Sequence, residues 1–162
     1  MIDGVVTTIA SRSDFHEAIR SAFVHAAEND ADEIVVVDPN FADWPLNERA
    51  IAASLATWVS SRRRLTVFAK DFDEMARRHS RFVEWRRQWS HVVQCRTDDE
   101  VDNESLPTLL LVPGMVVVRL LDRVRYRGLA SGRPIDLEEG RRTIDALLQR
   151  SNEAFPSTTL GL

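Results

Sequence analysis

The stretch from residue 31 to 59 constrains the fold more than any other part of the chain. Its apolar, β-branched run Ile34-Val35-Val36-Val37 ends on Asp38-Pro39, and apolar residues at helical spacing follow from Ile51 to Val59. A strand that is apolar throughout, without alternation, is typical of a central strand buried on both faces of a sheet. We therefore predict a buried strand over 33–38 that feeds a crossover helix over 47–60.

Strand-like and helix-like segments alternate along the first hundred residues. Short apolar runs at 65–69 and 91–96 are typical of strands, and helical periodicity marks a helix that begins at Asp14 and another over 72–89. Such alternation predicts a parallel sheet with helices on its faces and right-handed crossovers.

The pattern changes after the acidic loop at 97–105. Two apolar runs, 108–112 and 115–121, are joined by Pro113-Gly114, which predicts an antiparallel hairpin. The remaining segments are expected to be edge strands at 5–10 and 123–127, a loop at 128–134, and a last helix that is capped by Asp136 and ends near residue 151. The fold class that follows is α/β, with residues 1–162 as a single domain. It has a mixed sheet with a parallel βαβαβ core plus an antiparallel hairpin, and helices on both faces.

Composition removes several classes of protein. The net charge of −4 argues against a protein that coats nucleic acid through bulk charge. Cys95 is the only cysteine, which excludes an internal disulfide and an all-cysteine metal site. No run approaches 18 apolar residues and no signal-like segment opens the chain, so we expect a cytoplasmic protein that does not contact a membrane. Lys70 is the only lysine, and this preference for arginine indicates a GC-rich, bacterial gene.

The common catalytic and metal-binding motifs are absent from the sequence. The six glycines are too scattered for a phosphate-binding loop, and there is no Gly-x-Ser-x-Gly, His-Glu-x-x-His or Cys-x-x-Cys. His79 and Cys95 are better explained as a hydrogen-bonded imidazole beside an apolar helix face and a small buried hydrophobe than as catalytic groups. We therefore expect no catalytic residue, no metal and no cofactor.

Polar residues at the carboxyl ends of the predicted strands form a first candidate site. In open parallel sheets, ligands bind beyond these ends, so side chains from different strands can converge there on a polar or phosphate-bearing ligand. The candidates are Asp38, Asn40, Trp44, Lys70, Asp71 and Arg96. The alternative is that strands end in polar residues because the chain emerges into water there.

The stretch from residue 62 to 96 forms a second candidate site, because it carries ten basic residues against four acidic ones. A nucleic acid could contact the arginines of its predicted helix. These are Arg77, Arg78, Arg81, Arg86 and Arg87. The alternative is a solvated face, because the pairs Asp73–Arg77, Glu74–Arg78 and Glu84–Arg87 have ion-pair spacing. The acidic loop at 97–105 could also fold back onto this surface.

The order of the elements resembles one half of the phospholipase D-like fold, in a bacterial branch. The resemblance rests on residues 81–87 leading to His91-Val92-Val93, and on residues 147–162 at the end of the chain. Active members use His-x-Lys, followed four residues later by Asp, with histidine as the nucleophile. This chain has no histidine after His91 and no lysine after Lys70, so the resemblance implies a non-catalytic relative. Active members also need two halves, which implies a homodimer here.

Three functions are compatible with these features. The first is a non-catalytic, phospholipase D-like cytoplasmic domain that acts by binding. The second is a nucleic-acid-binding module that uses the surface at 62–96. The third is a small enzyme or a metabolite- or phosphate-binding domain at the carboxyl edge of the strands.

Overall fold

The computed structural model describes residues 4–155, apart from the side chain of Asn103. The end of the chain from Pro156 to Leu162, on which part of the resemblance rests, lies outside the described residues. The strands are β1 (Val6–Ile9), β2 (Glu33–Val37), β3 (Arg64–Phe68), β4 (Val93–Thr97), β5 (Thr108–Val112), β6 (Val116–Asp122), β7 (Arg127–Ser131) and β8 (Asn152–Glu153). The helices are α1 (Arg12–Glu28), α2 (Arg49–Trp58), α3 (Asp73–Arg78), α4 (Ser80–Gln88), α5 (Pro134–Gln149) and the 3-10 turn Asn103–Ser105.

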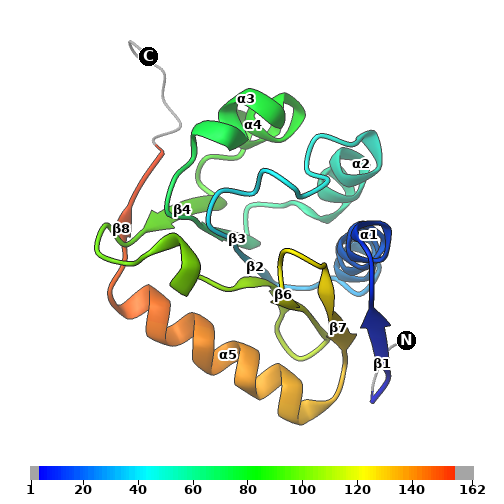
Figure 1. Cartoon of the computed structure of the whole chain (residues 1–162). Helices are drawn as coiled ribbons and strands as arrows, with labels where there is room; N and C mark the ends of the chain where they lie inside the picture. The colour runs from blue at the N-terminus through cyan, green and yellow to red at the C-terminus, as the bar shows by residue number, and fades with distance from the viewer. Residues whose placement is uncertain (1–3, 156–162) are drawn as a thin grey trace.

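One mixed sheet runs through the molecule in the order β1-β7-β6-β5-β2-β3-β4-β8 (Figure 1). Strands β2, β3 and β4 are parallel, with α2 and the α3–α4 pair as crossovers, which confirms the βαβαβ core. Ile34 to Val37 are at most 2% exposed, as expected for a central strand. The predicted hairpin is also confirmed, because β5 and β6 pair antiparallel around Pro113-Gly114.

Helices cover both faces of this sheet, which confirms the predicted fold class. Helices α1 to α4 lie on one face and α5 lies on the other (Figure 1). The alternating side chains of β2 separate accordingly: Ile34 and Val36 belong to the larger apolar cluster under α1–α4. Val35 and Val37 pack in a smaller cluster with Ile144 of α5. Among the described residues, no helix is long and apolar enough to cross a membrane.

The region after the hairpin differs from the prediction. Residues 123–126 form a turn and not an edge strand, and the expected loop at 128–134 contains most of β7. β7 is not at an edge, since it pairs with β1 and β6. Gly128 makes this pairing possible, because a Cβ there would lie 1.9 Å from the carbonyl oxygen of Arg119. The Asp122 side chain accepts hydrogen bonds from the amides of Val124 and Arg125 and so closes the turn.

Two predicted helix boundaries also change. The helix expected over 72–89 is split into α3 and α4 at His79, whose backbone (φ −121°, ψ 55°) is not helical. The N-cap of α5 is Arg133 and not Asp136. Asp136 instead lies in the first turn of α5, where it accepts hydrogen bonds from Ser131 and Arg133. The guanidinium of Arg133 lowers the pKa of this carboxyl.

Candidate functional site

Asp38 directly follows the central strand β2 and organises the loop beyond it. Its side chain is 7% exposed. Oδ2 accepts hydrogen bonds from the amides of Asn40 (3.1 Å) and Phe41 (2.8 Å). Oδ1 accepts a hydrogen bond from the Thr108 hydroxyl. The antiparallel pairing of β5 with β2 explains the last contact, because it brings the first residue of β5 beside the end of β2.

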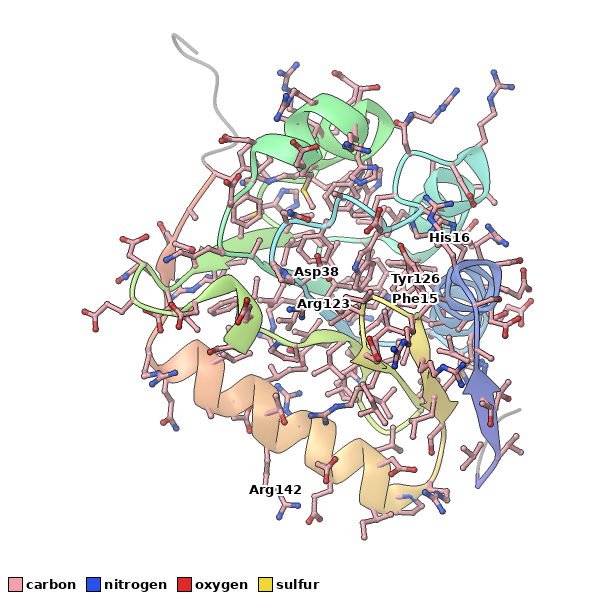
Figure 2. All side chains as sticks on the ribbon, viewed as in Figure 1. Phe15, His16, Asp38, Arg123, Tyr126 and Arg142 are labelled. Atoms are coloured by element: carbon pink, nitrogen blue, oxygen red, sulfur yellow. The ribbon has the colours of Figure 1, made fainter. Side chains whose placement is uncertain are left out.

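A cavity of about 410 Å³ opens next to Asp38, between the loop after β2, the first turn of α1 and the β6–β7 turn. We call it the Asp38 cavity. Aromatic rings form part of its wall: the Phe15 ring lies 5.6 Å from Trp44 and 6.0 Å from Tyr126, centroid to centroid. Figure 2 labels Phe15, Asp38, Arg123 and Tyr126 close together near the middle of the view. The other lining residues are Pro39, Asn40, Asp43, Thr108, Leu120 and Val124.

The rim of the cavity is polar and held by contacts within the protein. Burial raises the pKa of the Tyr126 hydroxyl, which has the Asp43 carboxylate and the Arg12 guanidinium as charged neighbours. The His16 ring donates a hydrogen bond to the carbonyl oxygen of Asp43, with an N–O distance of 2.6 Å. Arg123 donates to the carbonyl oxygen of Leu106. The rim thus places carboxylate, guanidinium and phenol groups beside aromatic surface.

His79 holds the loop after β2 that lines the cavity. Its Nε2 donates to the carbonyl oxygen of Phe41, 2.7 Å away, and the ring is 4% exposed. Phe41 has a positive φ of 60°, so its backbone needs such a restraint. Burial lowers the pKa of His79, which favours the neutral imidazole. The structure therefore buries His79 with a hydrogen bond at Nε2, in line with the sequence-based interpretation, while its buried Nδ1 has no partner among the described residues.

The six residues predicted at the strand ends do not all converge. Asp38, Asn40 and Trp44 line the cavity, whereas Lys70, Asp71 and Arg96 are absent from its lining. Their side chains have other contacts. Lys70 donates to the carbonyl oxygen of Asp99, and Asp71 accepts from the amide of Asp73 at 2.7 Å. Arg96 donates to the hydroxyl and carbonyl oxygens of Ser151, at 2.8 and 2.9 Å.

The arginines of the second candidate site fall into two groups. Arg77, Arg78 and Arg87 have exposed side chains in ion pairs with Glu74 or Glu84. Arg77 thus pairs with Glu74 and not with Asp73. Arg81 is also exposed and donates to the main-chain carbonyl of Asn47 at 2.9 Å. Arg86 differs from the others because it is only 5% exposed.

The acidic loop at 97–105 contacts basic residues other than the arginines of α3 and α4. Asp98, 8% exposed, lies 3.8 Å from the Arg150 guanidinium after α5, measured from Oδ2 to Nε. The loop also receives the Lys70 hydrogen bond described above. The acidic loop therefore contacts Lys70 of the stretch at 62–96, while Asp98 is buried beside Arg150.

Sequence reasoning missed the part of the cavity that comes from α1, from β5 and β6 and from the β6–β7 turn, and two residues of the loop after β2. The missed residues are Phe15, Thr108, Leu120, Arg123, Val124 and Tyr126, together with Pro39 and Asp43. The alternation of basic and apolar residues at 123–127 was visible but indicated an edge strand. Only the pairing of β5 with β2 brings this segment to the end of β2.

The cavity lining contains neither His, Cys nor Lys among the described residues. In the same part of the chain, no group of three or more His, Cys, Asp or Glu side chains is placed to hold a metal ion. The geometry is that of a binding cavity with hydrogen-bonding groups at its rim and aromatic rings in its wall.

No protein-family profile matches the sequence, and no curated protein matches it either. Solved structures of similar fold include the following two. TrmBL2, an archaeal chromatin protein with a described mode of DNA binding, is 10% identical with a TM-score of 0.65, over 92% of this chain and 54% of that one. Phosphatidylserine synthase from Haemophilus influenzae Rd KW20 is 14% identical with a TM-score of 0.55, over 98% of this chain and 42% of that one.

These two similar structures define the fold class of this chain. The synthase belongs to the phospholipase D superfamily, so the mixed sheet and its helices support a phospholipase D-like fold for this chain. The chain spans about half the length of the two proteins it resembles. At these identities the likeness shows the fold alone.

Proposed function

We propose that this chain is a non-catalytic, phospholipase D-like cytoplasmic domain that acts by binding a small polar ligand in the Asp38 cavity. The observation that carries the proposal is the cavity itself, whose lining contains both aromatic rings and charged groups. The absence of any histidine after His91 and any lysine after Lys70 supports a non-catalytic role, because the superfamily's nucleophile motif needs both.

The charges at the cavity argue for the type of ligand. Asp38 and Asp43 contribute carboxylates and Arg123 a guanidinium, while Lys70 and Arg96 point elsewhere. With the Arg12 guanidinium near Tyr126 at the rim, the two carboxylates and two guanidiniums leave no excess positive charge, so the cavity does not favour a phosphate. A ligand with a ring to lie on Phe15, Trp44 or Tyr126 and hydroxyl or amino groups to meet the carboxylates fits this wall better.

A thermal-shift screen with nucleosides, monosaccharides and aromatic amino acids tests the proposal. A bound compound should raise the melting temperature of the wild-type protein in a saturable way. Asp43→Ala should reduce the shift, because Asp43 is an exposed rim group. Glu138→Ala is the matched control: it removes an exposed carboxylate that pairs at 3.7 Å with Arg142. Arg142 lies on α5, far from the cavity (Figure 2).

Two results would contradict the proposal. One is a shift that Asp43→Ala and Glu138→Ala reduce equally, which would place the ligand outside the cavity. The other is an activity that hydrolyses a simple phosphodiester, such as bis(p-nitrophenyl) phosphate. This activity would have to copurify with the protein through two further columns. That result would make the chain an enzyme.

DNA binding through the exposed arginines of α3 and α4 is a second candidate function. The fold likeness to a DNA-binding chromatin protein and the exposure of Arg77 (71%), Arg78 (59%) and Arg87 (50%) favour it. Their pairing with Glu74 and Glu84 weighs against it. Fluorescence anisotropy with duplex DNA over a salt series tests it. Arg77→Ala/Arg78→Ala should lower the salt slope by about 2, at about one per phosphate contact, and Arg141→Ala/Arg142→Ala on α5 should not.

We further propose that the protein is a homodimer. The chain spans about half the length of the similar proteins, and phospholipase D-like enzymes unite two halves. Light scattering after size exclusion should then give a mass of twice 18.4 kDa. A mass of 18.4 kDa at every concentration would contradict the proposal.

A further inference from the structure

A second pocket, independent of the Asp38 cavity, lies along β4 beneath α4. Its volume is about 660 Å³. Strand β3 covers one side of β4, while β8 pairs only with Arg96 and Thr97 on the other. The part of β4 before these residues therefore borders the pocket. We call it the Arg86 pocket; its walls include Arg64, Arg86, His91, Gln94, Cys95 and Glu153.

Arg86 is the unusual residue of this pocket. It is 5% exposed, yet no described residue accepts a hydrogen bond from it and no described carboxylate pairs with it. Its Nε is fully buried without a partner. A buried guanidinium without a counter-charge is strongly unfavourable, and buried charges in proteins are normally paired. Burial accordingly lowers the pKa of Arg86.

The neighbours of Arg86 do not supply the missing charge. The Phe155 ring lies under the guanidinium, with 4.7 Å from Cζ to the ring centroid, and itself stacks on Phe72 at 5.2 Å. This contact covers one face of the guanidinium plane and leaves the N–H groups at its edge without acceptors. Burial raises the pKa of the nearby Cys95 to about 11, so its thiol is neutral at pH 7.

The remaining polar groups of the pocket also favour an anion. Arg64 contributes a second guanidinium, which is 64% exposed and lies 3.6 Å from the Glu33 carboxylate, measured from Nη2 to Oε2. Ser90, His91 and Gln94 can donate hydrogen bonds. Glu153 is the one acidic residue of the lining, and it is exposed to solvent. An arginine fork matches the oxygen geometry of phosphate and can bind it in a bidentate manner.

We propose that the Arg86 pocket binds the phosphate group of a small ligand, with the buried Arg86 as its principal contact. The phosphate lies in the plane of the guanidinium. There its oxygens accept hydrogen bonds from the N–H groups that donate to no described residue. Arg64 adds a second positive charge at the solvent side. The pocket is larger than phosphate alone, which leaves room for the rest of a phosphorylated metabolite along β4.

The test is a titration of inorganic phosphate at constant ionic strength, with chloride as the balancing salt and acetate as a second anion. In the wild-type protein we expect a saturable rise of the melting temperature with phosphate that acetate does not reproduce. Arg86→Met should weaken the apparent affinity for phosphate at least about tenfold, the effect of losing roughly one charged hydrogen bond. Arg87→Met is the matched control, because it removes the neighbouring arginine of the same helix, which is 50% exposed.

An effect of phosphate that is equal in Arg86→Met and Arg87→Met, or equal to that of acetate, would overturn the proposal. A wild-type protein without any saturable phosphate effect would overturn it too. If Arg86→Met does not fold, the wild-type protein itself gives the answer by NMR. The Nε–H resonance of Arg86, assigned by its absence in Arg86→Lys, should shift on addition of phosphate. An unchanged resonance at saturating phosphate would contradict direct contact.

Discussion

Asp38 and Arg86 are charged residues buried to the same degree, yet their surroundings differ. Asp38 is 7% exposed and accepts three hydrogen bonds, from two amides and one hydroxyl. Arg86 is 5% exposed and donates none to a described residue. The difference teaches that burial alone does not identify a binding residue. The satisfied carboxylate shapes its loop, whereas the unsatisfied guanidinium retains the capacity to bind a ligand.

The largest effect should come from Asp38→Ala. The change leaves the amides of Asn40 and Phe41 and the Thr108 hydroxyl without their acceptor, so the free energy of unfolding should fall by roughly 2–4 kcal/mol. Urea denaturation followed by tryptophan fluorescence measures it. Asp43→Ala, at an exposed position nearby, should change stability by less than about 1 kcal/mol. If Asp38→Ala and Asp43→Ala lowered the free energy of unfolding by similar amounts, Asp38 would not differ from Asp43 as a residue that supports the fold.

His79, which is hydrogen-bonded to the loop after β2, should make the free energy of unfolding depend on pH. Burial lowers the pKa of His79 from its ordinary value of 6.5, so the unfolded chain binds the proton more readily than the folded protein. Its contribution is therefore complete above pH 6.5 and is lost as the pH falls from there towards the folded-state pKa. The slope for one proton is at most about 1.4 kcal/mol per pH unit.

Urea denaturation at a series of pH values measures this slope. His79→Gln should reduce it, because glutamine can still donate to the carbonyl oxygen of Phe41 but does not titrate. His25→Gln, which removes a histidine near the end of α1, should leave the slope in place. An identical slope in wild type and His79→Gln would show that other groups cause it.

Arg86→Met should not lower the free energy of unfolding, in contrast to Asp38→Ala. Without phosphate, methionine removes an unpaired buried charge and keeps an unbranched side chain beside Phe155. The free energy of unfolding should therefore stay the same or rise by about 1 kcal/mol. Denaturation in chloride buffer measures this change. A fall of more than about 2 kcal/mol would mean that Arg86 is well satisfied in the free protein, and the contrast with Asp38 would fail.

The smallest effect should come from the neighbour of Arg86. Arg87 and Glu84 form an exposed ion pair with an Nη1–Oε1 distance of 3.4 Å. A double-mutant cycle with Arg87→Ala and Glu84→Ala should give a coupling free energy of at most about 0.5 kcal/mol, reduced further by salt. A coupling several times larger would indicate that this helix surface is more ordered than an ordinary solvated face.

The sequence by itself determined the part of the fold that depends on local patterns. The apolar run Ile34–Val37 predicted the central strand, because a strand buried on both faces needs apolar side chains on both. Pro113-Gly114 between two apolar runs predicted the hairpin. Asp38, Asn40 and Trp44 were expected near a ligand site because they follow the central strand, and they line the cavity. Lys70, Asp71 and Arg96 were expected there for the same kind of reason and do not line it.

Only the tertiary structure decided which distant segments meet. β5 pairs antiparallel with β2, and this long-range pairing brings Thr108, Arg123 and Tyr126 to Asp38. Five arginines of the stretch at 77–87 had the same appearance in the sequence, yet Arg86 alone is buried, with its guanidinium over the Phe155 ring. Periodicity reports which face of an element is apolar, but the partner of a buried charge is set by contacts between residues far apart in the chain.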